Sequence, residues 1–95
     1  MTTELSFEWD NDKATRNANK HQVSFEEAKT VFDDPMGITF IDEEHSVDEE
    51  RYITIGLSNR GRLLMVAHTD RSDRIRVISA RKAKKKEERF YAEAK

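Results

Sequence analysis

The sequence contains no cysteine, a single proline and only three glycines among its 95 residues. Without cysteine there is neither a disulfide nor a thiolate metal site, and this composition fits a reducing compartment. The three glycines are dispersed, so they form no phosphate-binding loop, and no Gly-x-Ser-x-Gly element occurs. Nucleoside-triphosphate chemistry and serine hydrolysis therefore have no recognisable motif in this chain.

Long apolar runs are also missing. No segment approaches the roughly 18 apolar residues that a membrane-spanning helix needs, and the N-terminal MTTELSFEWD has no apolar stretch typical of a signal peptide. We therefore expect a soluble, cytoplasmic protein without a membrane partner. The histidines His21, His45 and His68 each lack a second ligand at metal-binding spacing, so we expect no metal site and no cofactor.

Charged residues are abundant, at 38% of the chain, and their two signs are segregated. Residues 1–50 carry 4 basic and 14 acidic side chains, whereas residues 51–95 carry 13 basic and 5 acidic ones. Six of the carboxylates lie within residues 42–50, which predicts an acidic loop. The basic half predicts a surface that attracts a polyanion, even though the formal net charge is −2.

Local signals in the first half predict two helices. Asp10 is a good N-cap for a helix over residues 11–20. Ser24 and Glu27 have the spacing of a capping box at the start of a second helix. That helix should end before Pro35, because a proline disfavours helical geometry in the residue that precedes it.

Alternating or continuous apolar runs predict the strands. These runs cover residues 5–9, 38–41, 52–57, 63–67 and 74–80. The run at 63–67 is apolar on both faces, which predicts a central strand. We therefore expect an α+β protein, a single domain over residues 1–95. Its four- to five-stranded sheet should be mostly antiparallel, with two N-terminal helices and one C-terminal basic helix.

The segment RIRVISARKAKKKEERFY at 74–91 begins as a strand and then changes pattern at Ser79, a good N-cap residue. A helix starting there would place Arg81 and Lys82 in its first turn, followed by Lys84–Lys86. The positive end of the helix dipole makes each such cation cost roughly 0.3–1 kcal/mol. This arrangement predicts a bound anion, with RNA phosphate and an acidic protein surface as the two alternatives.

The remaining polar residues suit metal-independent RNA cleavage, in which the 2′-hydroxyl of the RNA is the nucleophile. That reaction needs a proton acceptor and a proton donor near neutral pH, and cations for the phosphorane. Candidates for proton transfer are His21, His68 and the Glu49/Glu50 pair, and candidates for the phosphorane are Arg51, Arg62, Arg74, Arg76 and Arg81. Four of these candidates have a structural alternative: a helix cap for His21, a buried strand end for His68, and a solvated strand face for Arg74 and Arg76.

Several segments together resemble the BrnT family of bacterial toxins. They are FEWDNDKATRNANKH at 7–21, VSFEEAKTVFDDP at 23–35, EERYITIGLS at 49–58, GRLLMV at 61–66 and RIRVISARKAKKKEERFY at 74–91. The resemblance covers almost the whole chain in the same order, and the FEWD…N…KH and ISARKA segments are its most specific parts.

This resemblance implies a ribonuclease of a type II toxin–antitoxin system with a RelE-like fold. It implies inhibition of translation through cleavage of an RNA substrate. It also implies neutralisation by a ribbon-helix-helix antitoxin, in a 2:2 complex that binds promoter DNA through the antitoxin. The alternative from the residues alone is a non-catalytic module that binds nucleic acid or a protein partner.

Site residues follow from the positions that match the family motifs. His21 is expected to transfer a proton, Glu50 to act as the alternative base or to orient Arg51, and the arginines to bind phosphate. The expected catalytic set is His21, Glu50, Arg51, Arg76 and Arg81, and the expected RNA-binding set is Lys20, Arg74, Lys82, Lys84, Lys85 and Lys86. One departure is Gln22, which stands where the family usually has glycine, a residue that closes a helix in the left-handed conformation.

Overall fold

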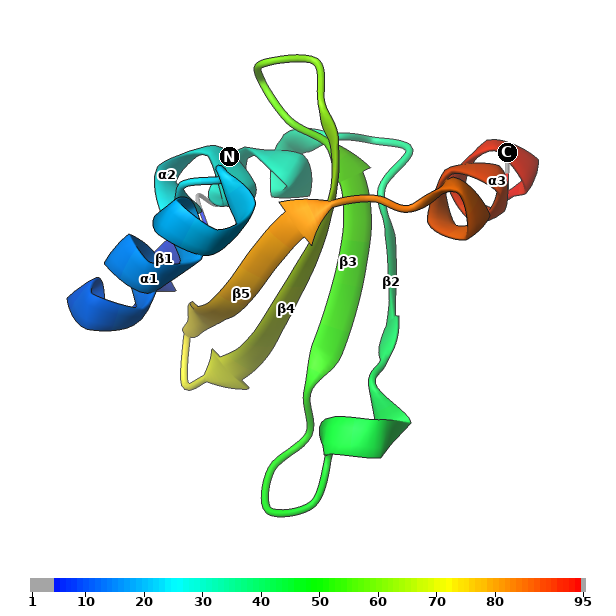
Figure 1. Cartoon of the computed structure of the whole chain (residues 1–95). Coiled ribbons are helices and arrows are strands. Elements are labelled where there is room, and N and C mark those ends of the chain that lie inside the picture. Colours follow the sequence, from blue (N-terminus) through cyan, green and yellow to red (C-terminus); the bar gives the residue numbers. More distant parts are fainter. Residues whose placement is uncertain (1–4, 95) are drawn as a thin grey trace.

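A computed structural model describes residues 5–94, which form one five-stranded sheet. Helices lie around this sheet (Figure 1). The strands are β1 (Ser6–Glu8), β2 (Ile38–Ile41), β3 (Tyr52–Leu57), β4 (Leu63–Arg71) and β5 (Arg74–Lys82). The helices are α1 (Asn11–His21), α2 (Phe25–Ala28) with its 3₁₀ continuation η1 (Lys29–Asp33), the 3₁₀ turn η2 (Glu43–His45) and α3 (Lys85–Glu93). This order confirms the predicted α+β class.

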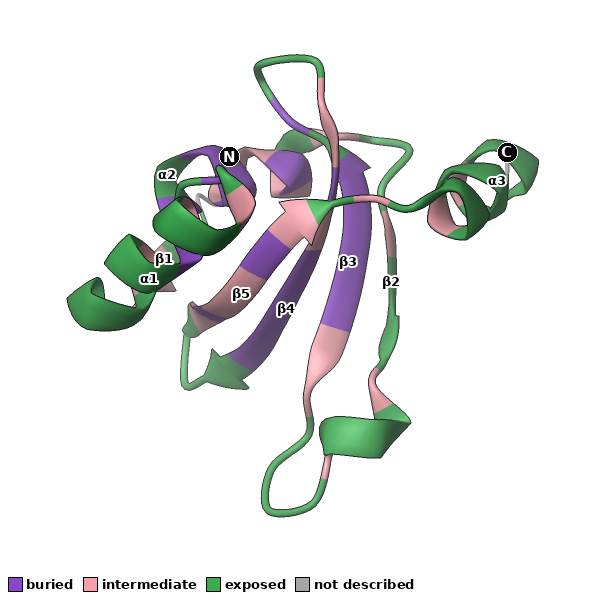
Figure 2. Ribbon diagram, viewed as in Figure 1, coloured by how far each residue is buried: buried purple, intermediate pink, exposed green. Residues whose placement is uncertain are grey.

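The sheet has the strand order β1-β5-β4-β3-β2, so β4 is central, as its two apolar faces predicted. Three of the four neighbouring pairs are antiparallel, and only β1 and β5 run parallel. Ala67 and His68 of β4 pair with Ser79 and Val77 of β5, so Ile78 is the extra residue of a bulge in β5. Burial concentrates in β3, β4 and β5, while the helices present exposed outer surfaces (Figure 2).

One face of the sheet is covered by α1 and α2. Its core is built from Val23, Phe25, Ala28 and Val31 of the helical segment, packed on β4 and β5. These side chains are almost fully buried, which removes their apolar surface from water. We call this face the helical face.

The other face is covered only in part. Ile53, Ile55 and Ala67 form a smaller buried cluster there, and Tyr91 of α3 packs against it. Because side chains alternate along a strand, this cluster faces away from α1 and α2. We call it the open face. In Figure 1, α3 stands on the opposite side of the molecule from α1 and α2.

Both predicted N-caps are present, although the second differs from a full capping box. Asp10 accepts a hydrogen bond from the Lys13 backbone N–H at 3.0 Å, and Ser24 accepts one from the Glu27 backbone N–H at 3.0 Å. The Glu27 carboxylate does not return to Ser24. It instead accepts hydrogen bonds from Ser58 and Arg62, so a long-range ion pair replaces the local contact.

The family usually has glycine at residue 22, which left open whether Gln22 adopts the left-handed conformation or shifts the turn; it adopts that conformation. Gln22 has φ 57° and ψ 35°, and its backbone N–H donates to the Ala18 carbonyl at 2.9 Å. Its side-chain Nε2 donates to the Asn19 carbonyl. Gln22 therefore keeps the turn at the conformational cost of a side chain in left-handed geometry, roughly 1–2 kcal/mol.

The prediction that Ser79 begins the last helix is wrong. Ser79 lies within β5, opposite Ala67, and the strand continues to Lys82 opposite Leu64. Strand pairing with β4 overrides the helix-forming tendency of the residues after Ser79, because propensity is weak beside tertiary contacts. The helix begins at Lys85, five residues later than the first predicted position, Ala80.

Between residues 5 and 94, no helix combines the length and apolar character needed to cross a membrane.

Candidate functional site

Three of the five predicted catalytic residues share the open face of the sheet. Arg81 lies opposite Met65, and Arg76 lies opposite Thr69. Arg51 directly precedes β3, two residues before Ile53, whose side chain belongs to the open-face cluster. Strand alternation therefore directs all three guanidinium groups to the face that α1 and α2 leave uncovered.

Two of these arginines are held by carboxylates. Arg76 Nη1 donates to Glu8 Oε2 at 3.2 Å, and Glu8 belongs to β1, directly beside Arg76 in register. The exposed Arg74 lies 3.8 Å from the other oxygen of Glu8. Since Glu8 and Arg76 side chains are both about one-quarter exposed, the pair remains accessible to a competing anion.

The Arg81 guanidinium has a two-pronged contact with Glu87 of α3. Its Nη1 donates to Oε1 at 2.8 Å and its Nη2 donates to Oε2 at 2.7 Å. Arg81 Nη2 also lies 3.0 Å from the sulfur of Met65. The hydrogen bond from Arg81 lowers the pKa of Glu87 below its ordinary value. This planar, bidentate geometry is the one that guanidinium groups also use for phosphate.

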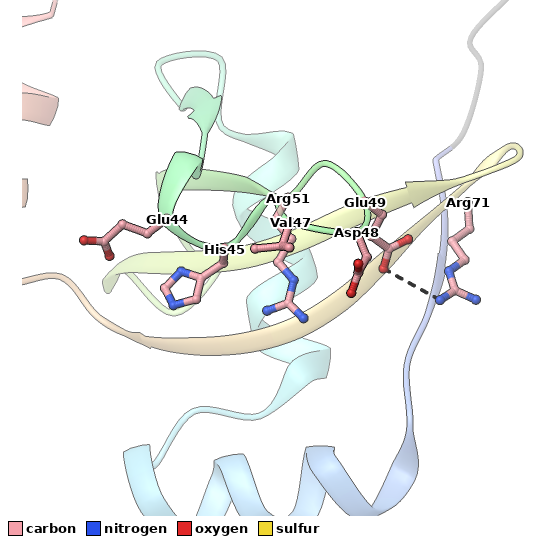
Figure 3. A pocket seen from close by; sticks show the side chains of 7 residues that line it. All are labelled: Glu44, His45, Val47, Asp48, Glu49, Arg51 and Arg71. Carbon is pink, nitrogen blue, oxygen red and sulfur yellow. Dashed lines mark ion pairs between the residues drawn. The ribbon is translucent and has the colours of Figure 1, made fainter.

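Arg51 lines a surface cavity of about 470 Å³ beside the acidic loop (Figure 3). Among residues 5–94 its guanidinium has no hydrogen bond or ion pair, whereas the nearby Arg71 lies 3.8 Å from Glu49. The other residues that line the cavity are Glu44, His45, Val47 and Asp48. Arg51 is therefore the candidate arginine without a bonded carboxylate among the described residues, although Glu44, Asp48 and Glu49 line the same cavity.

The same loop contains potential metal-ligand atoms. His45 Nδ1 lies 2.8 Å from Asp42 Oδ2, and the ligand atoms of Asp42, Glu44 and His45 lie within 4.8 Å of one another. His45 and Glu44 are exposed, and such acidic groups are common on protein surfaces. This arrangement by itself identifies no metal centre.

His21 lies at the other end of the sheet from the acidic loop. It is one helical turn beyond Asn17, on the same face of α1, and the Asn17 amide contacts both backbone groups of Ala80 in β5. Within the described part of the chain, the imidazole makes no hydrogen bond or ion pair. His21 and the exposed Lys20 thus lie near the end of β5 that carries Arg81 and Lys82.

The predicted residues accordingly fall into two groups. Glu50 and Arg51 lie where β3 begins, while His21 and Arg81 lie where β5 ends. Arg76 is five residues before Arg81, which corresponds to roughly 16 Å along a strand. Glu50 is exposed, and its charge raises the pKa of the Tyr52 hydroxyl.

The predicted RNA-binding lysines gather where β5 passes into α3. Lys82 ends the strand, and Lys84, Lys85 and Lys86 surround the start of the helix, all of them exposed. The electrostatic cost of these cations at a helix start is offset by Glu87, whose carboxylate accepts a hydrogen bond from the Lys84 backbone N–H at 2.8 Å.

Two other candidates have structural roles. His68 is buried at 4% exposure, its Nε2 lies 2.8 Å from the Thr54 hydroxyl, and burial lowers its pKa to about 4. It is therefore a neutral core residue at physiological pH. Arg62, one of the candidates for binding phosphate, pairs with the buried Glu27 and donates to the Gln22 carbonyl.

Sequence reasoning gave Asn17 no specific role, although it is central to the geometry around His21. Its Nδ2 donates to the Val23 and Ala80 carbonyls, both at 2.9 Å, and its Oδ1 accepts from the Ala80 N–H at 3.1 Å. Asn17 is the buried polar residue of α1. Its side chain bonds the backbone of β5 at the edge that the short β1 leaves unpaired. The two partners, Asn17 and Ala80, are 63 residues apart in the sequence, so no local pattern reveals this contact.

Comparisons with known proteins agree with this architecture. A crystal structure at 1.1 Å resolution of the Brucella abortus ribonuclease toxin BrnT matches the fold with a TM-score of 0.66 and 21% sequence identity. The match covers 86% of this chain and 100% of that one. A search of curated proteins found no match.

A family model provides the assignment. The model described as the ribonuclease toxin BrnT of type II toxin–antitoxin systems matches residues 9–87, which include α1, the entire β2–β5 region and the start of α3. The chain therefore belongs to the BrnT family of ribonuclease toxins of type II toxin–antitoxin systems.

Proposed function

We propose that this toxin cleaves RNA without a metal ion and thereby inhibits translation in the cytoplasm. The observation that carries the proposal is the gathering of Arg51, Arg76 and Arg81 on the open face of the sheet. Always-charged guanidinium groups on one accessible face suit the binding of a phosphodiester and of the charge that develops on it.

In the proposed reaction, the 2′-oxygen of a ribose attacks the adjacent phosphorus as its proton passes to a base. The bond from phosphorus to the 5′-oxygen of the next nucleotide breaks, and an acid protonates that oxygen. The products are a 2′,3′-cyclic phosphate and a free 5′-hydroxyl. His21 or Glu50 is the proposed proton-transfer group, since the two residues lie at opposite ends of the sheet. The phosphorane is stabilised by the arginines at the same end as the scissile phosphate, either Arg81 near His21 or Arg51 and Arg76 near Glu50, and the other arginines bind neighbouring phosphates.

Substrate binding requires an exchange of partners at two of the arginines. Phosphate oxygens would replace Glu8 on Arg76 and Glu87 on Arg81, while Arg51 needs no such exchange. The lysines at the start of α3, together with Lys20 and Arg74, would attract the RNA backbone. Binding should consequently weaken as salt rises, because counterions are released from the RNA.

The purified toxin should cut RNA in the presence of EDTA. Arg76→Ala and Arg81→Ala should each reduce cleavage by roughly 100-fold, the loss typical of removing one transition-state donor, and His21→Ala should reduce it as well. Arg16→Ala is the matched control, since Arg16 is exposed on α1 and outside the open face. A folded wild-type protein that binds RNA but never cuts it would instead indicate a non-catalytic binding module.

We further propose that the antitoxin partner is of the ribbon-helix-helix type. The family assignment implies an antitoxin, and the arginines of the open face offer it a surface to cover. We expect a 2:2 complex of toxin and antitoxin, in which the antitoxin binds the promoter DNA. Co-purification of the toxin with the product of the neighbouring gene, followed by mass measurement and promoter binding, tests the stoichiometry and the DNA contact.

A further inference from the structure

The two ends of helix α3 are attached to the rest of the protein by different side chains. No residue of α3 is buried, so the contacts of its partly exposed side chains fix its position. Near its start, the Glu87 carboxylate accepts hydrogen bonds from both Nη groups of Arg81 on β5. Near its end, the Tyr91 hydroxyl donates to Asp34 Oδ2 at 2.6 Å. The Arg81–Glu87 contact therefore fixes the first turns of α3.

This contact occupies the end of the Arg81 guanidinium group. Nη1 donates to Glu87 Oε1 at 2.8 Å and to the Lys82 carbonyl at 3.1 Å. Nη2 donates to Glu87 Oε2 at 2.7 Å and lies 3.0 Å from the Met65 sulfur. A phosphate that binds a guanidinium end-on uses the same two Nη groups as a carboxylate does. Such a phosphate can therefore bind Arg81 only after Glu87 has left.

An anion can reach the Arg81–Glu87 contact from solvent. The Arg81 side chain is 25% exposed and the Glu87 side chain 22%, and the nearby Lys82 and Lys84 are both exposed. Glu87 Oε1 also accepts a hydrogen bond from the Lys84 backbone N–H at 2.8 Å, which caps α3 without the help of Arg81. Glu87 can consequently exchange Arg81 for water while α3 stays helical.

We propose that Glu87 is an autoinhibitory group of the free toxin. Its carboxylate occupies the place of an RNA phosphate on Arg81, and binding of RNA there releases the start of α3 from the sheet. The contact between Tyr91 and Asp34 keeps the other end of the helix attached. This inference rests on the proposed RNA-binding function and adds a competitor and a movement to it.

The test compares the RNA affinity of Glu87→Gln with that of Glu88→Gln. Both variants remove one negative charge from α3, but Glu88 is exposed and makes no ion pair with Arg81. Glutamine at position 87 keeps an oxygen that can accept the Lys84 N–H. The probe is a 2′-O-methyl oligoribonucleotide, which has the phosphates of RNA but no free 2′-hydroxyl, so it cannot be cleaved.

Fluorescence anisotropy should show that Glu87→Gln binds this probe roughly fivefold more tightly than Glu88→Gln, the size expected for loss of a partly exposed competing ion pair. When Arg81→Ala is added to each variant, the two should bind equally, because the gain acts through Arg81. Circular dichroism should show the same helix content in every variant.

The position of α3 provides a second readout. The chain has no cysteine, so spin labels can be placed at Glu88→Cys on α3 and Arg60→Cys in the turn between β3 and β4, two exposed positions. The distance between the labels should be narrowly distributed in the free protein. The distribution should broaden when the oligonucleotide binds, and also in Glu87→Gln without it.

Several results would overturn the proposal. Equal affinities of Glu87→Gln and Glu88→Gln would mean that RNA does not compete with Glu87, and weaker binding by Glu87→Gln would mean that Glu87 holds Arg81 ready for RNA. An unchanged label distance, or no binding of the probe by any variant, would overturn it as well. Cleavage of unmodified RNA is measured separately: a wild type that binds RNA but never cuts it refutes the proposed enzyme, while the gain in affinity of Glu87→Gln still supports autoinhibition.

Discussion

Replacing Arg62 with alanine should destabilise the fold strongly, because it leaves the Glu27 carboxylate buried without a cation. Glu27 has a side chain only 4% exposed, and it accepts hydrogen bonds from Arg62 Nε at 2.9 Å, from Arg62 Nη2 and from the Ser58 hydroxyl at 2.7 Å. Arg62 also donates to the Gln22 carbonyl at 3.0 Å. The pair therefore joins α2 to the hairpin between β3 and β4.

The expected loss follows from the burial of Glu27. Removing one partner of a buried ion pair typically costs about 3–5 kcal/mol, and the lower value applies because the Arg62 side chain is 26% exposed. A loss of about 3 kcal/mol should lower the melting temperature by roughly 12–24 °C in a domain of this size. That is a large part of the roughly 5–15 kcal/mol that stabilises most domains.

Thermal and urea denaturation followed by circular dichroism measure this loss. Arg60→Ala is the matched control, since Arg60 lies 3.9 Å from the same carboxylate with a side chain that is 72% exposed. Exposed pairs contribute about 0–1 kcal/mol, so the control should melt near the wild-type temperature. The double variant Glu27→Leu/Arg62→Met should recover much of the loss. Equal effects of Arg60→Ala and Arg62→Ala would refute the reasoning, and so would a double variant no better than Arg62→Ala.

The same pair predicts a dependence of stability on pH. Hydrogen bonding from Arg62, with a smaller contribution from Ser58, lowers the pKa of Glu27 below its ordinary value of 4.5. A carboxyl group with a lowered pKa stabilises the fold above the unfolded value and loses that contribution as the pH falls towards the folded value. The difference in stability between wild type and Arg62→Ala should thus be full at pH 7 and shrink below about pH 4.5. A constant difference down to pH 3 would contradict the assignment.

Two further substitutions test the helix that carries His21. Asn17→Ala removes three hydrogen bonds and leaves the backbone N–H and carbonyl of Ala80 unpaired, so it should lower the free energy of unfolding by roughly 2–3 kcal/mol. Urea denaturation measures this loss. A variant as stable as wild type would show that another group bonds the Ala80 backbone. Gln22→Gly should raise the free energy of unfolding by about 0.5–1 kcal/mol, because glycine adopts the left-handed conformation without steric cost. A melting temperature below that of wild type would mean that the hydrogen bond from the Gln22 side chain to Asn19 is worth more than the steric cost removed.

The sequence by itself determined the elements whose signals are local. The N-caps Asp10 and Ser24 and the strand runs were predicted, because each depends on residues only a few positions apart. The left-handed conformation of residue 22 was not, because the chain has glutamine where the family usually has glycine. The central position of β4 was predicted from its apolar character on both faces. The family motifs lie in the same segments, and the match of the family model is consistent with them.

The tertiary structure alone decided where β5 ends and what its cations contact. Ser79 has a helix-capping side chain, yet pairing with β4 extends the strand to Lys82 and moves the helix start to Lys85. Arg81 consequently lies on the open face and is held by Glu87, while Arg62 is occupied by a carboxylate 35 residues away. These outcomes depend on strand pairing and ion pairs between distant segments, whose energies exceed the local preferences that a sequence displays.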